Sequence, residues 1–506
     1  MLSRLYKNIL VIGGNASGLA AASQARRENP DADITVLERG DYISYGSCGL
    51  PYYVSGIVRD FNSLFTYEPS YFEEKRKIRI LKNHRVVSIN TFKKEVVADI
   101  FSSNTFSANT GAGSFLTWGQ TGRNENTFPD GINIIPNNKN FNSISFAYDR
   151  LVICSGASPV KPDIPGINAK GVFCFRDVKD AVVLKKYIET QNPKQAVIIG
   201  SGSVGLLMAE ALAISGLKVT IVETKNRVFE SYEEEITSVL EEKIKNSGIQ
   251  LLTSYRVNSI NYNRESGQAF SVSAVSSKSV NGEKIEIEAQ IVIAAVGIAP
   301  NTGFLESSSI ELNGYKAIKV NQKQQTSQAN IFSAGDCCLV KNIVTGSWDY
   351  IPSAGNAIKA GRVAGANAAG AGDIFEGSSA TKVDKIFGLE IARTGVGLTQ
   401  ALDYRFNAFK ITDNFSSHAK SLPGTENIIM ALIVDIGTRR ILGAQMAGKD
   451  TVGKRIDVFT AAITNEMTVD KAYMLDLSYT PAIATAPDAI TRMCGKAISV
   501  LKSKRF

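Results

Sequence analysis

One pattern constrains the fold more than any other, and it occurs twice. Residues 8–18 read Asn-Ile-Leu-Val-Ile-Gly-Gly-Asn-Ala-Ser-Gly, and residues 196–205 read Ala-Val-Ile-Ile-Gly-Ser-Gly-Ser-Val-Gly. Each copy is a short apolar run, a glycine-rich turn and an alanine-rich helical stretch, and we expect these helices to end near Asn29 and Ser215. The pattern predicts two βαβ units, and therefore an α/β fold with two doubly wound parallel sheets.

Each copy then reaches a second buried strand that ends in an acid, Glu38 or Glu223. The glycines let the backbone approach a pyrophosphate, the helix N-terminus faces its charge, and the acid accepts hydrogen bonds from a ribose. Two such sites in one chain indicate electron transfer between two dinucleotides, most simply FAD and NAD(P)H. Glu223 favours NADH because a carboxylate repels the 2′-phosphate of NADPH. The nearby Lys225 and Arg227 could offset this repulsion, so NADPH remains an alternative. The expected cofactor-binding residues are Gly13, Gly14, Asn15, Ala16, Ser17, Gly18, Glu38 and Arg39 in the first unit, and Gly200, Gly202, Ser203, Val204, Gly205 and Glu223 in the second.

Length and composition exclude several classes of protein. A chain of 506 residues exceeds one ordinary core, so two or three domains are expected. The net charge of +8 is spread along the chain, which suits anionic cofactors rather than a nucleic-acid partner. The N-terminus lacks the apolar region of a signal peptide and no apolar run reaches about 18 residues, so we expect a cytoplasmic protein without membrane contact. Two histidines and six scattered cysteines, with no Cys-x-x-Cys pair, predict neither a metal site nor a disulfide framework.

Cys48 is the candidate reactive group. It follows Glu38 closely, in the segment Ser-Tyr-Gly-Ser-Cys-Gly-Leu-Pro-Tyr-Tyr, and should therefore lie at the edge of the sheet where cofactors bind. If a helix begins at Gly49, the thiol stands at its N-terminus, where the helix dipole favours the thiolate. A thiolate beside a flavin can exchange electrons with it. Position alone does not decide between this role and that of a buried, inert cysteine.

Taken together, the motifs resemble the single-cysteine branch of the pyridine nucleotide-disulfide oxidoreductase family. That branch contains coenzyme A-disulfide reductases, NADH oxidases, NADH peroxidases and NAD(P)H polysulfide reductases. The resemblance covers nearly the whole chain except residues 102–145. It implies that Ser47, Ser155, Gly156, Gly297, Asp336 and Ala354 also bind cofactor, with Asp336 at the ribityl-pyrophosphate part of the flavin. The motifs that carry it are Gly13-Gly14-x-x-x-Gly18, Ser-Cys-Gly-Leu-Pro-Tyr-Tyr at 47–53, Ser-Gly-Ala-Ser-Pro at 155–159, Val-Gly-Ile-Ala-Pro-Asn-Thr at 296–302 and Ile-Phe-Ser-Ala-Gly-Asp at 331–336.

The resemblance also implies a domain order. An FAD-binding domain in two parts, 1–165 and 293–375, would enclose an NAD(P)H-binding domain at 166–292. A C-terminal α+β domain at 376–506 would form a homodimer, in which the partner subunit completes the active site. Residues 102–145 are rich in Asn, Ser, Thr and Gly, so we interpret them as a surface insertion that extends a hairpin.

The family's two-cysteine branch has a second cysteine five positions after the first, where this chain has Tyr53. A dithiol mechanism is therefore excluded, and Cys48 must cycle through a mixed disulfide or a sulfenic acid. Oxidase and peroxidase members usually carry a histidine in the first glycine motif, where Asn15-Ala16-Ser17 stands here. Together with the Gly-Leu-Pro-Tyr-Tyr continuation after Cys48, this favours the coenzyme A-disulfide type.

By resemblance, coenzyme A would lie near Arg26, Ser44 and Lys75. The charges of Arg26 and Lys75 can equally be interpreted as solvated surface charge. Tyr479 of the partner subunit would protonate or orient the leaving thiolate, whereas Ser421 stands where the family commonly has a second tyrosine. The expected function is an FAD-dependent NAD(P)H oxidoreductase that reduces coenzyme A disulfide or another small disulfide. The alternatives are an NADH oxidase that reduces O2 through a sulfenic acid and, from another class, a non-catalytic NADH-sensing flavoprotein.

Overall fold

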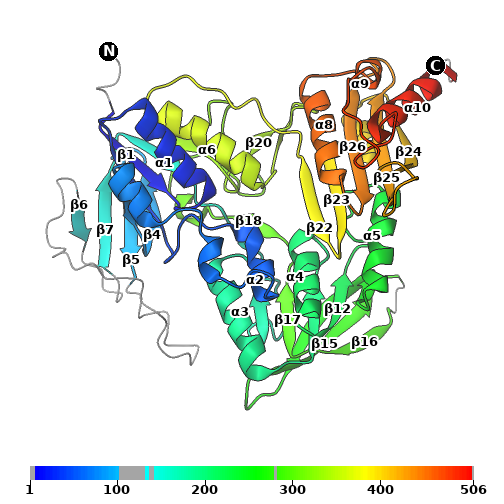
Figure 1. The fold of residues 1–506 in the computed structure, drawn as a ribbon. Helices are drawn as coiled ribbons and strands as arrows, with labels where there is room; N and C mark the ends of the chain where they lie inside the picture. Colours follow the sequence, from blue (N-terminus) through cyan, green and yellow to red (C-terminus); the bar gives the residue numbers. More distant parts are fainter. Residues whose placement is uncertain (1–5, 102–131, 136–141, 279–281, 504–506) are drawn as a thin grey trace.

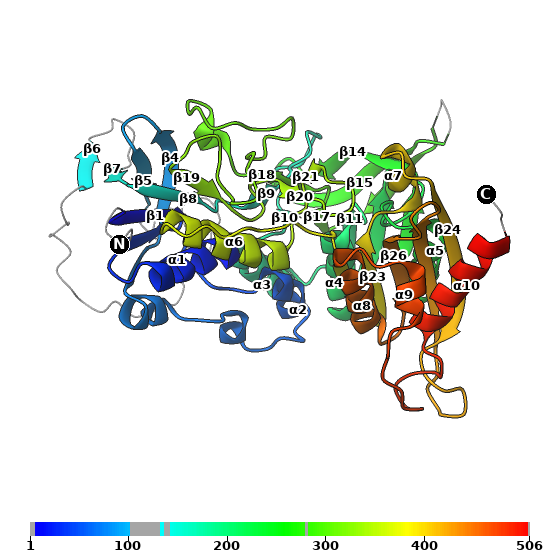
Figure 2. The ribbon, with the colours of Figure 1, turned by 90° about the horizontal axis from the view of Figure 1, so that it is seen from above.

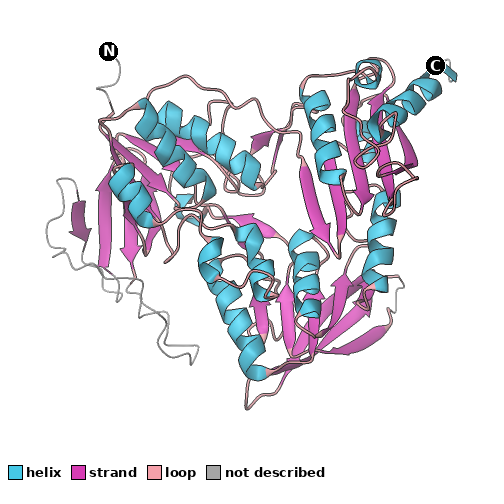
Figure 3. Cartoon of the chain, in the orientation of Figure 1, coloured by secondary structure: helices cyan, strands magenta, loops and turns pink. Residues whose placement is uncertain are grey.

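The computed structural model describes residues 6–101, 132–135, 142–278 and 282–503, which form three sheet-based units. Figure 1 shows the N-terminal unit on one side, the middle unit below and the C-terminal unit on the other side, and Figure 3 shows the helices and strands of each. Seen from above, the N-terminal unit lies on the left, and the C-terminal unit on the right overlaps the middle unit (Figure 2). Among the described helices, none is long and apolar enough to cross a membrane.

The N-terminal unit is built on a parallel sheet with the order β19-β8-β1-β2-β3. Its strands are apolar runs buried on both faces, as parallel sheets require. The last strand, β19, joins the sheet only after the chain has built the whole middle unit, so this unit is discontinuous in sequence. The strands are β1 (Asn8–Ile12), β2 (Asp33–Leu37), β3 (Ile78–Leu81), β8 (Arg150–Ile153) and β19 (Ile331–Ser333).

Two helices cover one face of this sheet side by side, α1 (Ala16–Glu28) and α6 (Ala354–Ala368) (Figures 1 and 2). Glycines in α6 permit their close approach. A Cβ at Gly361 would lie 2.4 Å from the Ser17 carbonyl oxygen, and one at Gly365 would lie 2.0 Å from that of Ala21.

A four-stranded antiparallel sheet in the order β4-β5-β7-β6 adjoins this unit. Its strands β5 and β7 pair with Glu95 opposite Ala147, as expected for the flanks of a hairpin. Most of the insertion expected at 102–145 lies outside the described residues. The strands are β4 (His84–Asn90), β5 (Glu95–Ile100), β6 (Ile132–Ile135) and β7 (Asn142–Ala147).

The middle unit repeats the parallel plan with the order β10-β17-β11-β12-β13 and adds an antiparallel sheet, β14-β15-β16. Its strands are β10 (Val172–Cys174), β11 (Gln195–Ile199), β12 (Lys218–Glu223), β13 (Gln250–Thr253), β14 (Tyr255–Tyr262), β15 (Ala269–Ser276), β16 (Lys284–Glu288) and β17 (Ile291–Ala294). Its helices are α3 (Val178–Gln191), α4 (Ser203–Ile214) and α5 (Glu234–Asn246). The short pair β9 (Ala157–Pro159) and β18 (Ile298–Pro300) lies in the connections between the N-terminal and middle units. The short pair β20 (Val340–Lys341) and β21 (Trp348–Asp349) lies between β19 and α6 of the N-terminal unit.

The C-terminal unit is an antiparallel sheet in the order β22-β23-β26-β25-β24. Strands β25 and β26 are buried nearly throughout because helices cover both faces, α8 and α10 on one side and α5 of the middle unit on the other. The strands are β22 (Lys382–Ile386), β23 (Leu389–Gly395), β24 (Ala408–Ser416), β25 (Asn427–Asp435) and β26 (Ile441–Gly448), and the helices are α7 (Leu398–Asp403), α8 (Val452–Thr464), α9 (Val469–Tyr473) and α10 (Ala489–Ser503).

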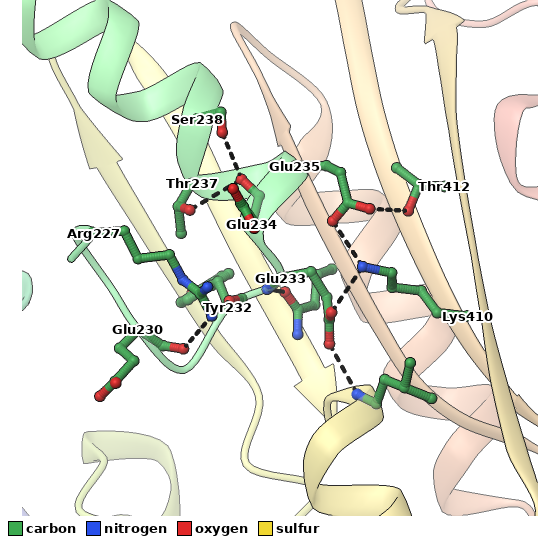
Figure 4. Close-up of polar contacts among 12 residues, drawn as sticks. Arg227, Glu230, Tyr232, Glu233, Glu234, Glu235, Thr237, Ser238, Lys410 and Thr412 are labelled. Carbon is green, nitrogen blue, oxygen red and sulfur yellow. Dashed lines mark hydrogen bonds and ion pairs between the residues drawn. The ribbon is translucent and has the colours of Figure 1, made fainter. Parts of the chain in front are cut away.

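A polar cluster joins the middle and C-terminal units (Figure 4). The Lys410 ammonium on β24 lies 3.0 Å from a Glu233 carboxylate oxygen and 2.8 Å from one of Glu235, at the start of α5. Glu233 also accepts a hydrogen bond of 2.8 Å from the Leu398 amide at the start of α7. Burial acts to raise the pKa of Glu235, but the hydrogen bond and charge of Lys410 outweigh it and lower that pKa.

Candidate functional site

The first glycine turn connects β1 to α1 in a conformation that other residues would obstruct. Gly13 has a φ of +108°, and a Cβ there would lie 2.2 Å from the Cys154 carbonyl oxygen. A Cβ at Gly18 would lie 1.8 Å from the Gly13 carbonyl oxygen. Both positions therefore require glycine, and the bare turn leaves backbone N–H groups at the start of α1 open to a ligand.

The acid at the end of the next strand holds this turn. Glu38 accepts hydrogen bonds from the amides of Gly14, at 2.7 Å, and Gly40, at 2.8 Å. Burial raises the pKa of Glu38, and the two amide hydrogen bonds act in the opposite direction. Each carboxylate oxygen keeps a second lone pair, which is available to a ribose hydroxyl.

The second turn is constructed in the same way. Gly200 has a φ of +100°, and a Cβ at Gly205 would lie 2.1 Å from the Gly200 carbonyl oxygen. Glu223 accepts hydrogen bonds from the Ser201 amide at 2.8 Å and from the Ser201 hydroxyl at 2.7 Å. The two halves of the sequence repeat thus form the same local structure, which fits one dinucleotide at each turn.

A cavity of about 330 Å³ opens above the first turn, at the carboxyl ends of β1 and β2. It brings together eight residues predicted to bind cofactor, Gly13, Gly14, Asn15, Glu38, Arg39, Ser47, Ser155 and Gly156. Seven further lining residues were not predicted as site residues, Tyr45, His84, Arg85, Cys154, Arg176, Asp177 and Asn301, although Tyr45 and Asn301 lie within motifs quoted above. A glycine turn, a helix N-terminus and a ribose-binding acid in one cavity fit the dinucleotide FAD.

Asp336 reaches the same turn from a distant part of the chain. Gly335 has a φ of +88°, and a Cβ there would lie 2.5 Å from the Ser17 hydroxyl. The Asp336 carboxylate pairs with Arg176 at 2.6 Å. Of the remaining predicted cofactor residues outside the second turn, Ala354 begins α6, and Gly297 has a φ of +134° in the segment that leads into β18.

Cys48 is exposed in a short 3₁₀ turn, Ser47–Gly49, that continues directly into helix α2 (Leu50–Val54). A helix therefore follows Cys48 directly, as expected from the sequence, and the thiol stands before the helix N-terminus. Its neighbour Ser47 lines the cavity. Cys154 also lines the cavity, but burial raises the pKa of its thiol so that it stays protonated.

The remaining cysteines give Cys48 no partner in the chain. Cys337, Cys338 and Cys494 are buried, and Cys174 is half-buried in β10. At the position of the second cysteine of the two-cysteine branch, Tyr53 packs edge-on against Phe61 with ring centroids 5.6 Å apart. The Lys185 ammonium lies 4.0 Å from the centroid of the Tyr53 ring.

The predicted substrate residues gather around two stacked tyrosines. The rings of Tyr67 and Tyr71 lie 4.4 Å apart at an angle of 16°. The Ser44 hydroxyl accepts a hydrogen bond from the Tyr67 amide, and the Lys75 ammonium lies 5.7 Å from the Tyr71 ring centroid. Arg26 donates to backbone carbonyls of the same segment, including that of Arg76 at 3.0 Å.

Several cations lie close together in this region. Burial, and then the charges of Arg76 and Arg362, lower the pKa of Arg27. Cations crowded together beside exposed aromatic rings are suited to an anionic nucleotide. We name this group, made of Arg26, Arg27, Ser44, Tyr67, Tyr71, Lys75, Arg76 and Arg362, the cationic patch.

Tyr479 lies with a relative exposure of 55% on the loop between α9 and α10. This loop touches the loop that carries Ser421, because the Ala419 amide donates to the Pro481 carbonyl at 3.0 Å. Buried Arg455 supports both loops through an ion pair of 2.8 Å with Asp488 and a hydrogen bond to the Ser417 carbonyl oxygen. Within the described residues, no three His, Cys, Asp or Glu side chains gather as a metal site.

Comparison with known proteins defines the class. Residues 7–361 match the family described as pyridine nucleotide-disulphide oxidoreductase, and residues 385–489 match its dimerisation domain. The chain belongs to this family, with an α/β fold and a dimerisation domain, and is an FAD-dependent NAD(P)H oxidoreductase.

Curated relatives match nearly the whole length of the chain. The NAD(P)H coenzyme A polysulfide/persulfide reductase of Pyrococcus horikoshii is 30% identical over 97% of this chain and 98% of its own. The NADH oxidase of Enterococcus faecalis is 30% identical over 94% and 95%, and the coenzyme A disulfide reductase of Staphylococcus haemolyticus is 26% identical over 97% and 99%. All three are enzymes, which favours an enzyme over the non-catalytic flavoprotein.

Solved structures resemble this chain over nearly its whole length. The crystal structure of reduced Bacillus anthracis CoADR-RHD superposes with a TM-score of 0.85 at 29% identity over 98% of this chain and 81% of that chain. The water-forming NADH oxidase of Lactobacillus brevis, bound to NADH, gives 0.84 at 26% identity over 98% and 99%.

Proposed function

We propose that the protein passes electrons from NADH through FAD to Cys48, and from Cys48 to coenzyme A disulfide or a related small disulfide. The observation that carries the proposal is the exposed Cys48 thiol beside the cavity, with Tyr53 where a second cysteine would be needed for dithiol chemistry. A single accessible thiol reduces a disulfide by way of a mixed disulfide.

The thiolate of Cys48 would attack one sulfur of the substrate disulfide, form a mixed disulfide and release one thiolate. FAD, which the first glycine turn and Glu38 would hold, would supply two electrons taken from NADH as a hydride. These electrons would cleave the mixed disulfide, restore the Cys48 thiolate and release the second substrate thiolate. Coenzyme A carries phosphate groups, and the cationic patch is the part of the N-terminal unit suited to hold them.

The proton for a departing thiolate would come from Tyr479 of the partner subunit. A phenol is protonated at neutral pH and donates readily. Support comes from the exposure of Tyr479 on a loop of the dimerisation domain that Arg455 and Asp488 hold in place.

The second candidate is an NADH oxidase that reduces O2 with Cys48 as a sulfenic acid. Ser421 favours it, because the loop that touches the Tyr479 loop lacks the second tyrosine of disulfide-reducing relatives. The Enterococcus faecalis NADH oxidase is also as similar to this chain as the Pyrococcus horikoshii reductase.

The proposal is tested with Cys48→Ser, and Cys174→Ser is the matched control. With NADH and coenzyme A disulfide, we expect Cys48→Ser to lose at least about a hundredfold in turnover, because the nucleophile is gone. The half-buried Cys174 lies outside the site, so its variant should keep full turnover. Undiminished turnover of Cys48→Ser would refute the role of this thiol.

Mass spectrometry of the resting protein separates the two candidates. A coenzyme A adduct on the peptide that contains Cys48 supports the disulfide reductase, and a single added oxygen supports the oxidase. The Cys174 peptide of the same digest should carry neither.

A further inference from the structure

A hairpin of the C-terminal unit lies along the helix that follows the second glycine turn. The hydroxyl of Ser203, the first residue of α4, donates a hydrogen bond of 2.8 Å to the Asp384 carboxylate on β22. The Phe387 amide, just after β22, donates one of 2.8 Å to Glu210 further along α4. Seven residues of helix and three of extended chain each span about 10 Å, so the two contacts fix hairpin and helix in register.

Asp384 therefore places a negative charge at the N-terminal end of α4. Its side chain has a relative exposure of only 10%, so solvent screens this charge weakly. Burial, and then the Asp384 charge, raise the pKa of Tyr232 nearby, and Asp384 contributes in the same way at Tyr52. The hydroxyl of Ser203 is directed to this carboxylate rather than to a ligand.

Lys382 offsets part of the charge of Asp384. The Lys382 ammonium lies 3.6 Å from the carboxylate oxygen that Ser203 contacts, and it sits 5.2 Å from the centroid of the Phe229 ring. Lys382 is more exposed than Asp384, at 46%, so it compensates the carboxylate only in part.

We propose that Asp384 and Lys382 set the affinity of the α4 site for the pyrophosphate of NAD(P)H, with Asp384 weakening it and Lys382 strengthening it. The inference rests on the proposed assignment of the α4 turn to NAD(P)H. A pyrophosphate at this helix N-terminus shares the same positive dipole end with the Asp384 carboxylate, and like charges repel. Moderate affinity lets the oxidised nucleotide leave after each turnover. The C-terminal unit would thereby contribute to nucleotide binding within its own subunit.

The test measures binding of ADP-ribose, which carries the pyrophosphate but no redox-active ring, to the full-length FAD-loaded protein by calorimetry. Asp384→Asn keeps an acceptor for Ser203 and removes the charge, so we expect Kd to fall about three- to tenfold. Lys382→Met should raise Kd by a similar factor. Both changes should shrink in high salt, and adenosine, which lacks phosphates, should respond to neither variant.

Asp470→Asn is the matched control, because it removes one carboxylate from α9 of the same unit, where Asp470 pairs with Arg439. Its Kd for ADP-ribose should equal that of the wild type. An Asp384→Asn protein that binds ADP-ribose equally or more weakly would overturn the inference, and so would a Lys382→Met protein that binds it more tightly. These results concern binding alone, whereas the proposed function fails if Cys48→Ser retains turnover.

Discussion

At the scale of single residues, the two glycine turns can be disabled one at a time. Gly18→Ala would place a methyl group 1.8 Å from the Gly13 carbonyl oxygen, and Gly205→Ala would place one 2.1 Å from that of Gly200. We expect the first variant to lose FAD, and the second to keep FAD but bind ADP-ribose at least about tenfold more weakly. Flavin absorbance after gel filtration and calorimetry measure these losses.

The control is Gly46→Ala, whose new methyl group would meet nothing closer than the Leu64 carbonyl oxygen at 3.9 Å. It should keep both ligands. If Gly18→Ala and Gly205→Ala affect FAD and ADP-ribose to the same extent, the assignment of one dinucleotide to each turn is wrong.

Asp180 makes stability depend on pH. Burial, and then the neighbouring charge of Asp177, raise its pKa from 3.8 to about 6 in the folded protein. The folded state therefore binds this proton more tightly, so the stability from Asp180 is fully present below about pH 4 and is lost as the pH rises through about 6. The loss by pH 7 is about 3 kcal/mol, at about 1.4 kcal/mol for each pKa unit.

Asp180→Asn cannot titrate, so its unfolding free energy should fall less between pH 4 and pH 7 than that of the wild type. Urea unfolding at the two pH values provides the comparison. An identical fall in both proteins would show that Asp180 has an ordinary pKa in the folded state.

Local residue patterns identified part of the site and missed contacts between distant segments. The glycines and Glu38 could be predicted because turn, strand and acid lie within one βαβ unit. Arg176 pairs with Asp336 across 160 positions, and no local pattern encodes that contact. Ser203 was predicted as a cofactor-binding residue from the second glycine motif. The Asp384 carboxylate that accepts its hydrogen bond, however, comes from the C-terminal unit.

At the scale of elements, the helices after both glycine turns could be predicted to within about one residue, since α1 ends at Glu28 and α4 at Ile214. Both follow an uninterrupted apolar pattern and end before polar, turn-forming residues. The packing of α6 on α1 could not be predicted. Gly361 and Gly365 are needed because a Cβ there would clash with the backbone of α1, and this is visible only once the two helices are packed together.

Lys410 connects strand β24 of the C-terminal unit to the start of helix α5 in the middle unit, so its replacement measures how much this contact stabilises the protein. Lys410→Met leaves the Glu233 and Glu235 carboxylates close together without a counter-charge, and we expect the unfolding free energy to fall by about 1–3 kcal/mol. Lys449→Met is the matched control, because the ion pair of Lys449 with Glu426 is exposed and its loss should leave the unfolding free energy nearly unchanged. If Lys410→Met and Lys449→Met lower the unfolding free energy equally in urea, the Lys410 cluster stabilises the protein no more than an exposed ion pair does.

At the scale of the whole molecule, the chain leaves the N-terminal unit, builds the middle unit and returns through β19 before forming the C-terminal unit (Figure 1). This order brings Gly335 against Ser17 at the start of α1, brings Asp336 to Arg176, and places Tyr479 on the most C-terminal unit. The chain has a dimerisation domain, and the proposed function combines one subunit's Cys48 with the other's Tyr479. Whether catalysis needs both subunits can therefore be tested by assembling dimers from two different variant subunits.

Subunit complementation answers it. Cys48→Ser and Tyr479→Phe subunits would each form weakly active homodimers. In a mixed dimer completed in trans, one site carries both substitutions and the other is fully wild type. With random assembly of equal amounts, half of the dimers are mixed, so the mixture should recover about a quarter of wild-type activity towards coenzyme A disulfide. If each site were completed within one subunit, every site of the mixed dimer would carry a substitution. Activity would then stay at the average of the two parents, which would contradict the trans arrangement.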